Sequence, residues 1–391
     1  MLSPRFQTRR YQLKKQAVLA VRRRHPWVFR SQLSSAANPF PAGQWLRLYD
    51  HGNETLGFGI YDPHSVVGIR VLKTGSHAPT RDWLWQMVHT ALTRRLPLYD
   101  ETDALRLIHG ENDGLPGIVL DRYGDVGVLQ TYSASVDTLG RYVAAIAREQ
   151  LGLRALAWRV PAKRKHSERG IRTLHGTLPS ALQIREAELN WHVPLLSGQK
   201  GGAFLDLRGL RRWLQRQNLS GKTVLNLFSN TGTLGLSALN AGAKHVLNVD
   251  SSASAIEFGI EKHSQPGMEW KQADAFLWLR EPPETQYDVV IVDPPQIVSS
   301  VSKVPAALRT YSALHSGALA RLKPGGILVT CCCSSRLTRN VFLDAARSDL
   351  APTLKLQTVL EPEKDHPVGF AEGDYLKIAV FSTKESGKLL V

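Results

Sequence analysis

The stretch that decides the fold is Thr223-Val224-Leu225-Asn226-Leu227-Phe228-Ser229-Asn230-Thr231-Gly232-Thr233. Its first half is an almost continuous apolar run, which is typical of a strand buried on both faces of a parallel sheet. Its second half joins a glycine to small polar residues, and a helical pattern follows over 234–241. Such a turn lets backbone N–H groups and the start of the helix face a ligand. The stretch therefore predicts the first strand and helix of an α/β domain with a ligand site above the strand.

The alternation of strand and helix continues toward the C-terminus. We expect strands at 245–249, 287–292 and 327–330, a helix at 253–263, and a second helix with apolar residues spaced over 307–322. Pro324-Gly325-Gly326 separates this second helix from the last strand. The rhythm predicts a parallel, doubly wound, Rossmann-like sheet that binds ligands at the carboxyl ends of its strands.

Two further modules precede this domain. Short β-like runs at 45–49, 56–61 and 66–71 alternate with turn residues, which predicts a small β-rich domain over 1–75. A helical pattern at 83–96, a Gly/Pro-rich segment at 110–117 and a strand at 126–132 predict a central α+β module over 76–188. The Rossmann-like domain then occupies 189–391.

The charge is strongly positive and unevenly distributed. The 391 residues carry a formal net charge of +15, and residues 1–100 contain fifteen basic but only five acidic side chains. A second basic cluster lies within 159–172 and includes Lys163, Arg164 and Lys165. Such an excess indicates a polyanionic partner, and nucleic acid is the first candidate. A basic solvated surface without such a partner is the alternative that composition leaves open.

The remaining composition bounds the class of protein. A hydrophobic content of 43% excludes a disordered chain, and no run of eighteen apolar residues occurs that would span a membrane. The N-terminus has no apolar segment followed by a cleavage site, so we expect a protein that is not exported. The three cysteines are adjacent, so they cannot bridge distant segments and lack zinc-ligand spacing. We expect a cytoplasmic protein that needs no metal.

Asp250 and Asp293 are candidate ligand contacts at strand ends. Asp250 lies eighteen residues after Gly232, where a carboxylate can accept both hydroxyls of a ribose; a helix-capping role is the alternative. Asp293 opens the run Asp293-Pro294-Pro295-Gln296, whose prolines hold the chain extended and rigid. This wall suits a flat aromatic base whose edge needs hydrogen-bond partners, with helix capping again the alternative for Asp293.

The third candidate is the run Cys331-Cys332-Cys333-Ser334 at the end of the last predicted strand. If the strand stays extended, Cys331 and Cys333 point to one face and Cys332 to the other. A cysteine at this edge is either ordinary packing or a thiolate nucleophile. Its position alone leaves both roles open.

These segments together resemble the bacterial large-subunit ribosomal RNA cytosine-5 methyltransferases of the RlmI type. The resemblance covers nearly the whole chain, and its ordered motifs are residues 23–29, 106–117, 121–124, 198–208 and 226–232, then Asp250, Asp274, 293–295, Cys333-Ser334 and Asp365-His366-Pro367. It implies an N-terminal PUA domain and a C-terminal class I methyltransferase domain that uses S-adenosylmethionine. The sequence departs from the family pattern at Gln296 and Ile297, where the family usually has Lys and Phe, and at Cys332, where it commonly has Ser.

The resemblance also implies roles for individual residues. Cys333 would be the nucleophile that adds to carbon 6 of cytosine, and Asp293 would contact the base and the cofactor. The remaining implied cofactor-binding residues are Asn226, Phe228, Asn230, Gly232, Asp250, Asp274 and Asp206. Residues expected to contact substrate RNA are Arg22, Arg23, Arg24, Lys163, Arg164, Lys165, Lys200, Pro294 and Pro295.

Two other functions remain open at this point. A base N-methyltransferase on the same scaffold would use Asp293-Pro294-Pro295 without a thiol. The other alternative is an RNA-binding protein with a degenerate catalytic domain, which Gln296 alone favours. The sequence leaves open which nucleotide is modified, whether the ribosomal RNA is naked or partly assembled, and whether the chain forms a homodimer.

Overall fold

The computed structural model describes residues 7–33, 40–160, 170–195, 203–298, 300–351 and 353–383. The chain divides into two compact units. The first comprises Met1–Ala187, Leu195–Ala203 and Lys364–Phe370, and the second comprises Glu188–Pro194, Phe204–Glu363 and Ala371–Val391. The first unit thus contains nearly all the residues over which two modules are expected, and the bounds 1–75 and 76–188 stay predictions.

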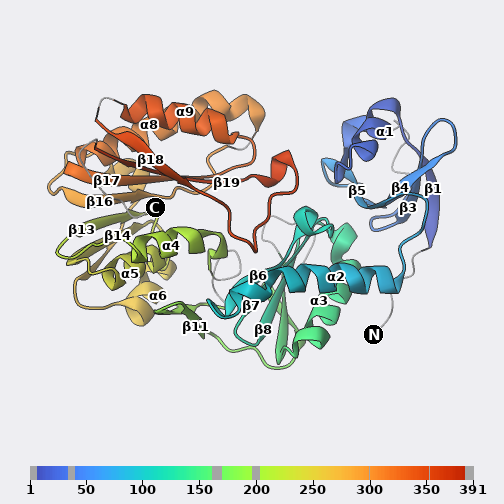
Figure 1. Ribbon diagram of the computed structural model, residues 1–391, viewed down its shortest axis with the longest axis horizontal. Coiled ribbons are helices and arrows are strands. Elements are labelled where there is room, and N and C mark those ends of the chain that lie inside the picture. The colour runs from blue at the N-terminus through green and yellow to red at the C-terminus, as the bar shows by residue number, and fades with distance from the viewer. Residues whose placement is uncertain are drawn as a thin grey trace. The chain divides into compact units, whose positions relative to one another are not determined.

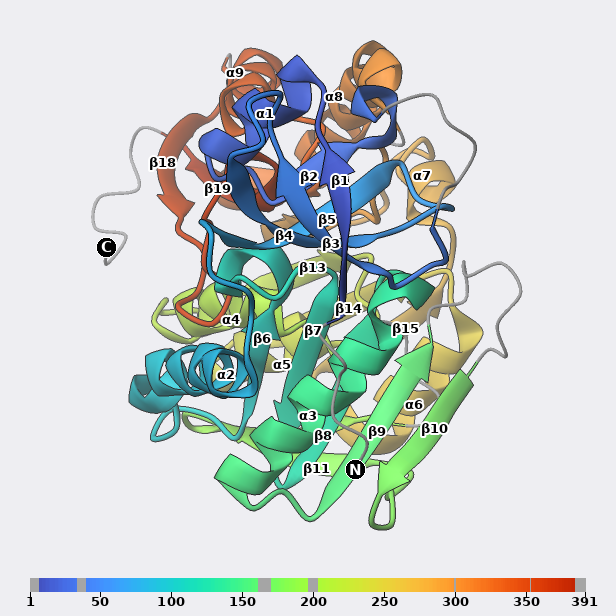
Figure 2. The same cartoon turned by 90° about the vertical axis from the view of Figure 1, so that its right-hand side faces the viewer.

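The N-terminal part of the first unit is a five-stranded sheet in the order β1-β3-β4-β5-β2, with helix α1 beside it (Figure 2). Tyr11, Val28 and Leu46 are among the side chains that pack its own apolar core. The elements are β1 (Thr8–Gln12), α1 (Lys15–Arg22), β2 (Trp27–Phe29), β3 (Trp45–Tyr49), β4 (Thr55–Tyr61) and β5 (Val67–Thr74). The small β-rich domain expected from the turn pattern is present.

A second five-stranded sheet, in the order β10-β9-β8-β7-β6, forms the rest of the first unit. Helices α2 and α3 pack on it side by side (Figure 2). Its elements are α2 (Arg81–Arg95), β6 (Ala104–His109), β7 (Ile118–Tyr123), β8 (Val126–Thr131), α3 (Asp137–Leu151), β9 (Ala155–Val160) and β10 (Gly170–His175). Glu111, which follows β6, accepts hydrogen bonds from Trp27 at 2.7 Å and Arg70 at 3.2 Å and so ties the two sheets together.

A buried ionic network holds the short segment Lys364–Phe370 in this unit. Arg95 and Asp113 form a fully buried ion pair, with Nη2 and Oδ2 2.6 Å apart. Arg95 also donates to the backbone carbonyl of Asp365, and the Asp365 carboxylate accepts the backbone N–H of Arg106 at 2.9 Å. Two buried charges need such satisfied partners, because an unpaired charge in the interior is strongly destabilising.

The second unit is built on a seven-stranded sheet in the order β15-β14-β13-β16-β17-β19-β18. In Figure 1, α8 and α9 lie on one face of the sheet and α4, α5 and α6 lie on the other. The strands are β13 (Thr223–Leu227), β14 (His245–Asp250), β15 (Met268–Gln272), β16 (Tyr287–Val292), β17 (Leu322–Cys333), β18 (Lys355–Leu360) and β19 (Leu376–Ser382). The helices are α4 (Arg208–Gln215), α5 (Thr233–Asn240), α6 (Ala253–His263), α7 (Ala275–Trp278), α8 (Val304–Ala320) and α9 (Arg339–Leu350).

This arrangement is the expected doubly wound α/β sheet, with one antiparallel strand, β19, near an edge. Two further strands are β11 (Leu182–Glu186), in the first unit, and β12 (Leu189–Val193), in the second. No helix in the described part of the chain is both long and apolar enough to cross a membrane.

The predicted boundary between the second helix and the last strand is wrong, since that strand is expected to begin only at Ile327, after Pro324-Gly325-Gly326. Leu322, assigned above to the apolar face of a helix, is the first residue of β17, and the helix ends at Ala320. Leu322 pairs with Tyr287, and a shift of register before the pair Val289–Ile327 accommodates the Pro-Gly-Gly segment within the strand. The apolar spacing of the helix runs on into the strand because both bury their residues against the same core.

Candidate active site

The carboxyl ends of four strands meet at one edge of the seven-stranded sheet. β13 pairs in parallel with β14 and β16, and β16 pairs in parallel with β17. The register places Val292 opposite Thr330, so Asp293 and Cys331 each follow one member of that pair. Turns that leave parallel strands at this edge are where α/β proteins bind ligands.

The turn after β13 has a strained backbone conformation. Phe228, Asn230 and Gly232 all have positive φ values, of 59°, 49° and 79°. Glycine is required at the last position for a second reason, because a Cβ there would lie 2.3 Å from the Trp270 ring. Residues other than glycine adopt such φ values at a cost and cluster at functional sites. This turn is therefore a candidate cradle for a ligand.

Asp250 holds this turn in place. Its Oδ2 accepts the backbone N–H of Asn230 at 2.8 Å, and its Oδ1 accepts the N–H of Ser252 at 2.8 Å. Each carboxylate oxygen has a further lone pair, so Asp250 can bind hydroxyl groups while keeping both bonds. The residue is half-buried and lies at the end of β14.

Asp274 caps a short helix next to the same edge. It is the N-cap of α7, and its Oδ1 accepts the N–H groups of Phe276 at 2.8 Å and Leu277 at 3.4 Å. The Phe276 ring meets Phe228 of the strained turn edge to face, with centroids 5.0 Å apart. Capping thus engages one oxygen of Asp274 and leaves the side chain exposed.

Asn226 and Asp206 are placed differently from the other cofactor candidates. The Asn226 side chain is fully buried in the sheet, and its Nδ2 donates to Oδ1 of Asn248 at 2.8 Å. Its own Oδ1 has no hydrogen-bond partner in the described part of the chain. Asp206 precedes α4 and accepts a hydrogen bond from the Tyr375 hydroxyl at 2.7 Å.

Asp293, Pro294 and Cys333 come together at the ends of β16 and β17. The Cys333 thiol, which is partly exposed, donates to the Pro294 carbonyl at 3.6 Å. Pro294 is buried, whereas Pro295 is exposed. A thiol at the open edge of the sheet can meet a reactant that enters from solvent.

The two neighbouring cysteines are in other surroundings. Cys331 and Cys332 are fully buried, in apolar clusters on opposite faces of the sheet. Burial raises the pKa of the Cys331 thiol well above its ordinary value, and the nearby Asp293 carboxylate raises it further. Burial also raises the pKa of Cys332, against the opposing effect of a hydrogen bond with Tyr311. Neither forms a thiolate readily, because burial disfavours the charged form.

Comparison with known proteins identifies the family. A model described as S-adenosylmethionine-dependent methyltransferase matches residues 134–381, and a model described as PUA-like domain matches residues 12–74. A ribosomal RNA large subunit methyltransferase of Deinococcus radiodurans is 33% identical over 397 residues, 95% of this chain and 96% of the relative. The chain belongs to the family of S-adenosylmethionine-dependent ribosomal RNA large subunit methyltransferases. The RlmI-type resemblance is thereby confirmed.

Other relatives agree with this assignment. Ribosomal RNA large subunit methyltransferase I of Alteromonas mediterranea is 32% identical over 385 residues, which cover 92% of this chain and 94% of that protein. A putative methyltransferase from Streptococcus mutans has a structure similar to this one, with a TM-score of 0.83, 20% identity, and coverage of 96% of this chain and 100% of that chain. A structure of a putative methyltransferase complexed with SAH matches with the same TM-score, identity and coverage. These two structures support the predicted fold.

The residues at the edge of the sheet fit the family's cofactor. S-adenosylmethionine combines a ribose, an adenine and a methionine part. Asp250 and Asp274 supply carboxylates at adjacent strand ends, and the strained turn of 228–232 brings backbone groups beside them. The buried Oδ1 of Asn226 adds an acceptor without a described partner at the start of the turn.

His263, at the end of α6, supports the turn and was missed in the sequence. Its Nδ1 donates to the Thr231 carbonyl at 2.6 Å, and its Nε2 accepts the backbone N–H of His192 at 2.8 Å. Burial lowers the pKa of His263, so the ring is neutral and both its nitrogens are engaged. A lone histidine at a helix end carries no sequence signal for this role.

Lys377 is a second residue that the sequence did not reveal. It is fully buried on β19, and its Nζ donates to the carbonyls of Ser334 at 2.7 Å and Asp374 at 2.6 Å. Burial lowers the pKa of Lys377, while the nearby Cys332, Asp374 and Cys333 oppose this effect. Lys377 pairs with Cys332 across the sheet, and its hydrogen bond to the Ser334 carbonyl fixes the chain immediately after Cys333.

The predicted RNA contacts are only partly described. Arg22 forms ion pairs with Asp50 at 2.9 Å and Glu54 at 2.8 Å, so its charge is partly neutralised. Arg23 and Arg24 are exposed at the end of α1, and Arg24 has a positive φ of 58°. Lys163, Arg164, Lys165 and Lys200 lie outside the described residues.

Proposed function

We propose that this chain methylates carbon 5 of a cytosine in large-subunit ribosomal RNA, with Cys333 as a covalent nucleophile. The observation that carries the proposal is the position of the Cys333 thiol, which is partly exposed and lies 3.6 Å from the Pro294 carbonyl. The names of the curated relatives support ribosomal RNA as the substrate. The PUA-like domain and the positive charge agree with an RNA partner.

Covalent catalysis makes carbon 5 of cytosine reactive enough to accept a methyl group. Carbon 5 of cytosine is too weak a nucleophile to be alkylated directly. Addition of the Cys333 thiolate to carbon 6 forms an S–C6 bond and moves the electron pair of the C5–C6 double bond toward carbon 5. Bound S-adenosylmethionine supplies an electrophilic methyl group on a sulfonium. Once carbon 5 carries the methyl group, loss of its proton re-forms the double bond and expels the thiolate.

Asp293 acts on the base, and Lys377 holds the strand end that carries Cys333. We expect Asp293, beside Pro294, to hydrogen-bond the N3 and N4 edge of the base, where a shared proton would stabilise the charge that develops at N3. Lys377 holds the chain beside Cys333 through its hydrogen bond to the Ser334 carbonyl. The target base has to leave its stack to reach Cys333, as it does for other enzymes that act on a base.

The test is methyl transfer to protein-free large-subunit ribosomal RNA with a tritium-labelled methyl donor, followed by digestion and identification of the labelled nucleoside. Wild type should yield 5-methylcytidine, and Cys333→Ser should lose at least a thousandfold in rate while still binding S-adenosylmethionine. Cys331→Ser is the matched control and should stay active. RNA with 5-fluorocytidine at the target should trap an adduct that survives denaturing electrophoresis. Label on another nucleoside, or an adduct formed by Cys333→Ser, would refute the proposal.

A further inference from the structure

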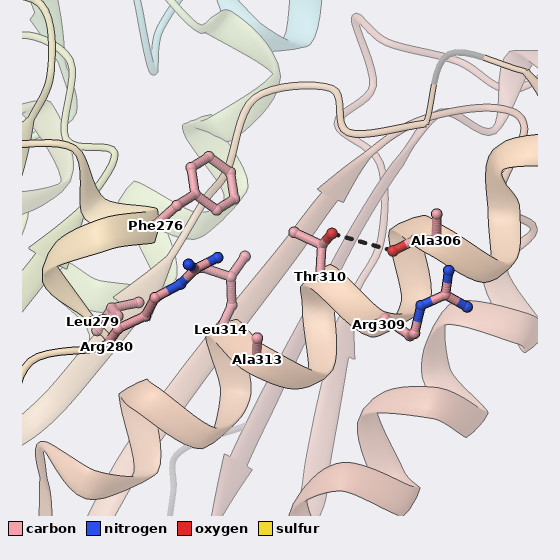
Figure 3. A pocket seen from close by; sticks show the side chains of 8 residues that line it. All are labelled: Phe276, Leu279, Arg280, Ala306, Arg309, Thr310, Ala313 and Leu314. Carbon is pink, nitrogen blue, oxygen red and sulfur yellow. Dashed lines mark hydrogen bonds between the residues drawn. The ribbon is translucent and has the colours of Figure 1, made fainter.

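A cavity of about 250 Å³ lies between α7 and α8 in the second unit. Figure 3 shows its lining, which consists of Phe276, Leu279, Arg280, Ala306, Arg309, Thr310, Ala313 and Leu314. The Thr310 hydroxyl donates a hydrogen bond to the Ala306 carbonyl of the same helix, at 3.2 Å. The cavity therefore presents an apolar interior with two guanidinium groups.

The two helices that line the cavity both begin at the edge of the sheet that carries the active site. α7 starts directly after Asp274, and α8 starts after the segment that leaves β16 through Asp293. Phe276 and Ala306 lie in the first turns of these two helices. Phe276 also contacts Phe228 of the turn after β13. The cavity therefore lies between two helices that both begin at the edge of the sheet where Asp293 and Cys333 lie.

The chemistry of the lining fits a nucleotide. In Figure 3 the Arg280 guanidinium lies near Leu314 and on the side of Phe276, whereas the Arg309 guanidinium lies at the far end of the lining, beyond Thr310. No ion pair joins Arg280 or Arg309 to a carboxylate in the described part of the chain, and no acidic side chain is among the described residues that line the cavity. Unopposed guanidiniums bind phosphate, and aromatic rings and guanidinium planes stack on bases.

The cavity between α7 and α8 is large enough for one aromatic ring. An apolar cavity of about 150 Å³ holds a benzene molecule. A cavity of about 250 Å³ that opens to solvent therefore has room for a pyrimidine-sized ring. The half-buried Phe276 and the buried Leu279 and Leu314 supply the apolar surface that such a ring covers.

We propose that this cavity binds a nucleotide of the substrate RNA that neighbours the target cytosine, with its base in the cavity and its phosphate on Arg280. Extrusion of the target from its stack leaves its neighbours without one stacking partner, and single-stranded RNA is commonly recognised by such replacement stacking. The inference rests on the proposed function, because it names a second contact of the same substrate. The site would contribute to the choice of sequence around the target.

Two variants of the full-length protein test the two halves of the site. Arg280→Ala removes the charge, and Ala313→Trp fills the cavity without changing the charge. Both residues are exposed, so the fold should tolerate the changes. Arg216→Ala is the matched control, since Arg216 is an exposed arginine at the end of α4 and is not part of the lining.

The measurements are affinity for protein-free large-subunit ribosomal RNA at several salt concentrations, the KM for that RNA, and S-adenosylmethionine affinity by calorimetry. Both variants should raise the KM for RNA by roughly tenfold, a size expected for the loss of one stacked base, with kcat and cofactor affinity unchanged. Arg280→Ala should also reduce the slope of log affinity against log salt by about 0.7, whereas Ala313→Trp should leave the slope unchanged.

The failure of this inference is distinct from failure of the proposed function. Wild-type KM and RNA affinity in both variants would overturn the inference, as would a loss of cofactor affinity in place of RNA affinity. A cavity that served a protein partner would give this same result of unchanged RNA binding. Failure of the wild type to label cytosine would refute the proposed function. The RNA affinities of the two variants, compared with wild type, would still show whether the cavity binds RNA.

Discussion

Replacement of Asp250 by alanine should weaken binding of S-adenosylmethionine, because this carboxylate joins two turns and faces the ligand edge. In the structure it accepts two backbone N–H groups, from Asn230 and Ser252, each at 2.8 Å. We propose that its remaining lone pairs accept the ribose hydroxyls. Loss of a hydrogen-bonding charged partner costs roughly 1.5–3 kcal/mol, which corresponds to about a ten- to 150-fold rise in Kd.

The assay is calorimetric titration of wild type and Asp250→Ala with S-adenosylhomocysteine and with its 2′-deoxy analogue. The wild type should lose affinity when the ligand lacks the hydroxyl, and Asp250→Ala should lose much less, since the partner of that hydroxyl is already gone. Asp344→Ala is the control, because Asp344 is an exposed aspartate on α9 that pairs only with Arg347 among the described residues. An Asp250→Ala protein that binds both ligands as wild type does would refute the reasoning.

Two further predictions concern the turn and its support. Gly232→Ala should weaken cofactor binding at least tenfold, because the added Cβ would lie 2.3 Å from the Trp270 ring. Gly221 is the control, since it has a similar φ of 72° but open space around it. Gly221→Ala should cost only about 1–2 kcal/mol of stability and leave the cofactor Kd unchanged. The urea midpoint of the protein should fall as the pH decreases from 7 toward 5. Burial lowers the folded-state pKa of His109 and His263 below the ordinary 6.5. As the pH falls, the unfolded chain therefore binds more protons than the folded chain does, and the free energy of unfolding decreases. A midpoint that stays constant over this range, or a His263→Gln variant with an undiminished dependence, would contradict this account.

Many elements of the second unit could be predicted because their signals are local. The strand at 287–292 and the helix at 253–263 have the predicted bounds. A short run of apolar residues indicates a buried strand, and apolar residues three and four positions apart indicate a helix. The end of α8 could not be placed this way. There the pairing of Leu322 with Tyr287 in the sheet outweighs the local helical spacing.

The sequence by itself determined which residues stand at the ends of the parallel strands. Asp250, Asp293 and Cys333 stand at the ends of apolar runs that the local sequence marks as strands. Because these strands are parallel, their carboxyl ends lie at the same edge of the sheet. The tertiary structure alone decided what surrounds them. His263 reaches Thr231 across 32 positions, Lys377 reaches Ser334 across 43, and the cavity joins α7 to α8. The physical reason is that backbone periodicity acts within a few residues, whereas hydrogen bonds, burial and cavities depend on packing between segments that the chain keeps far apart.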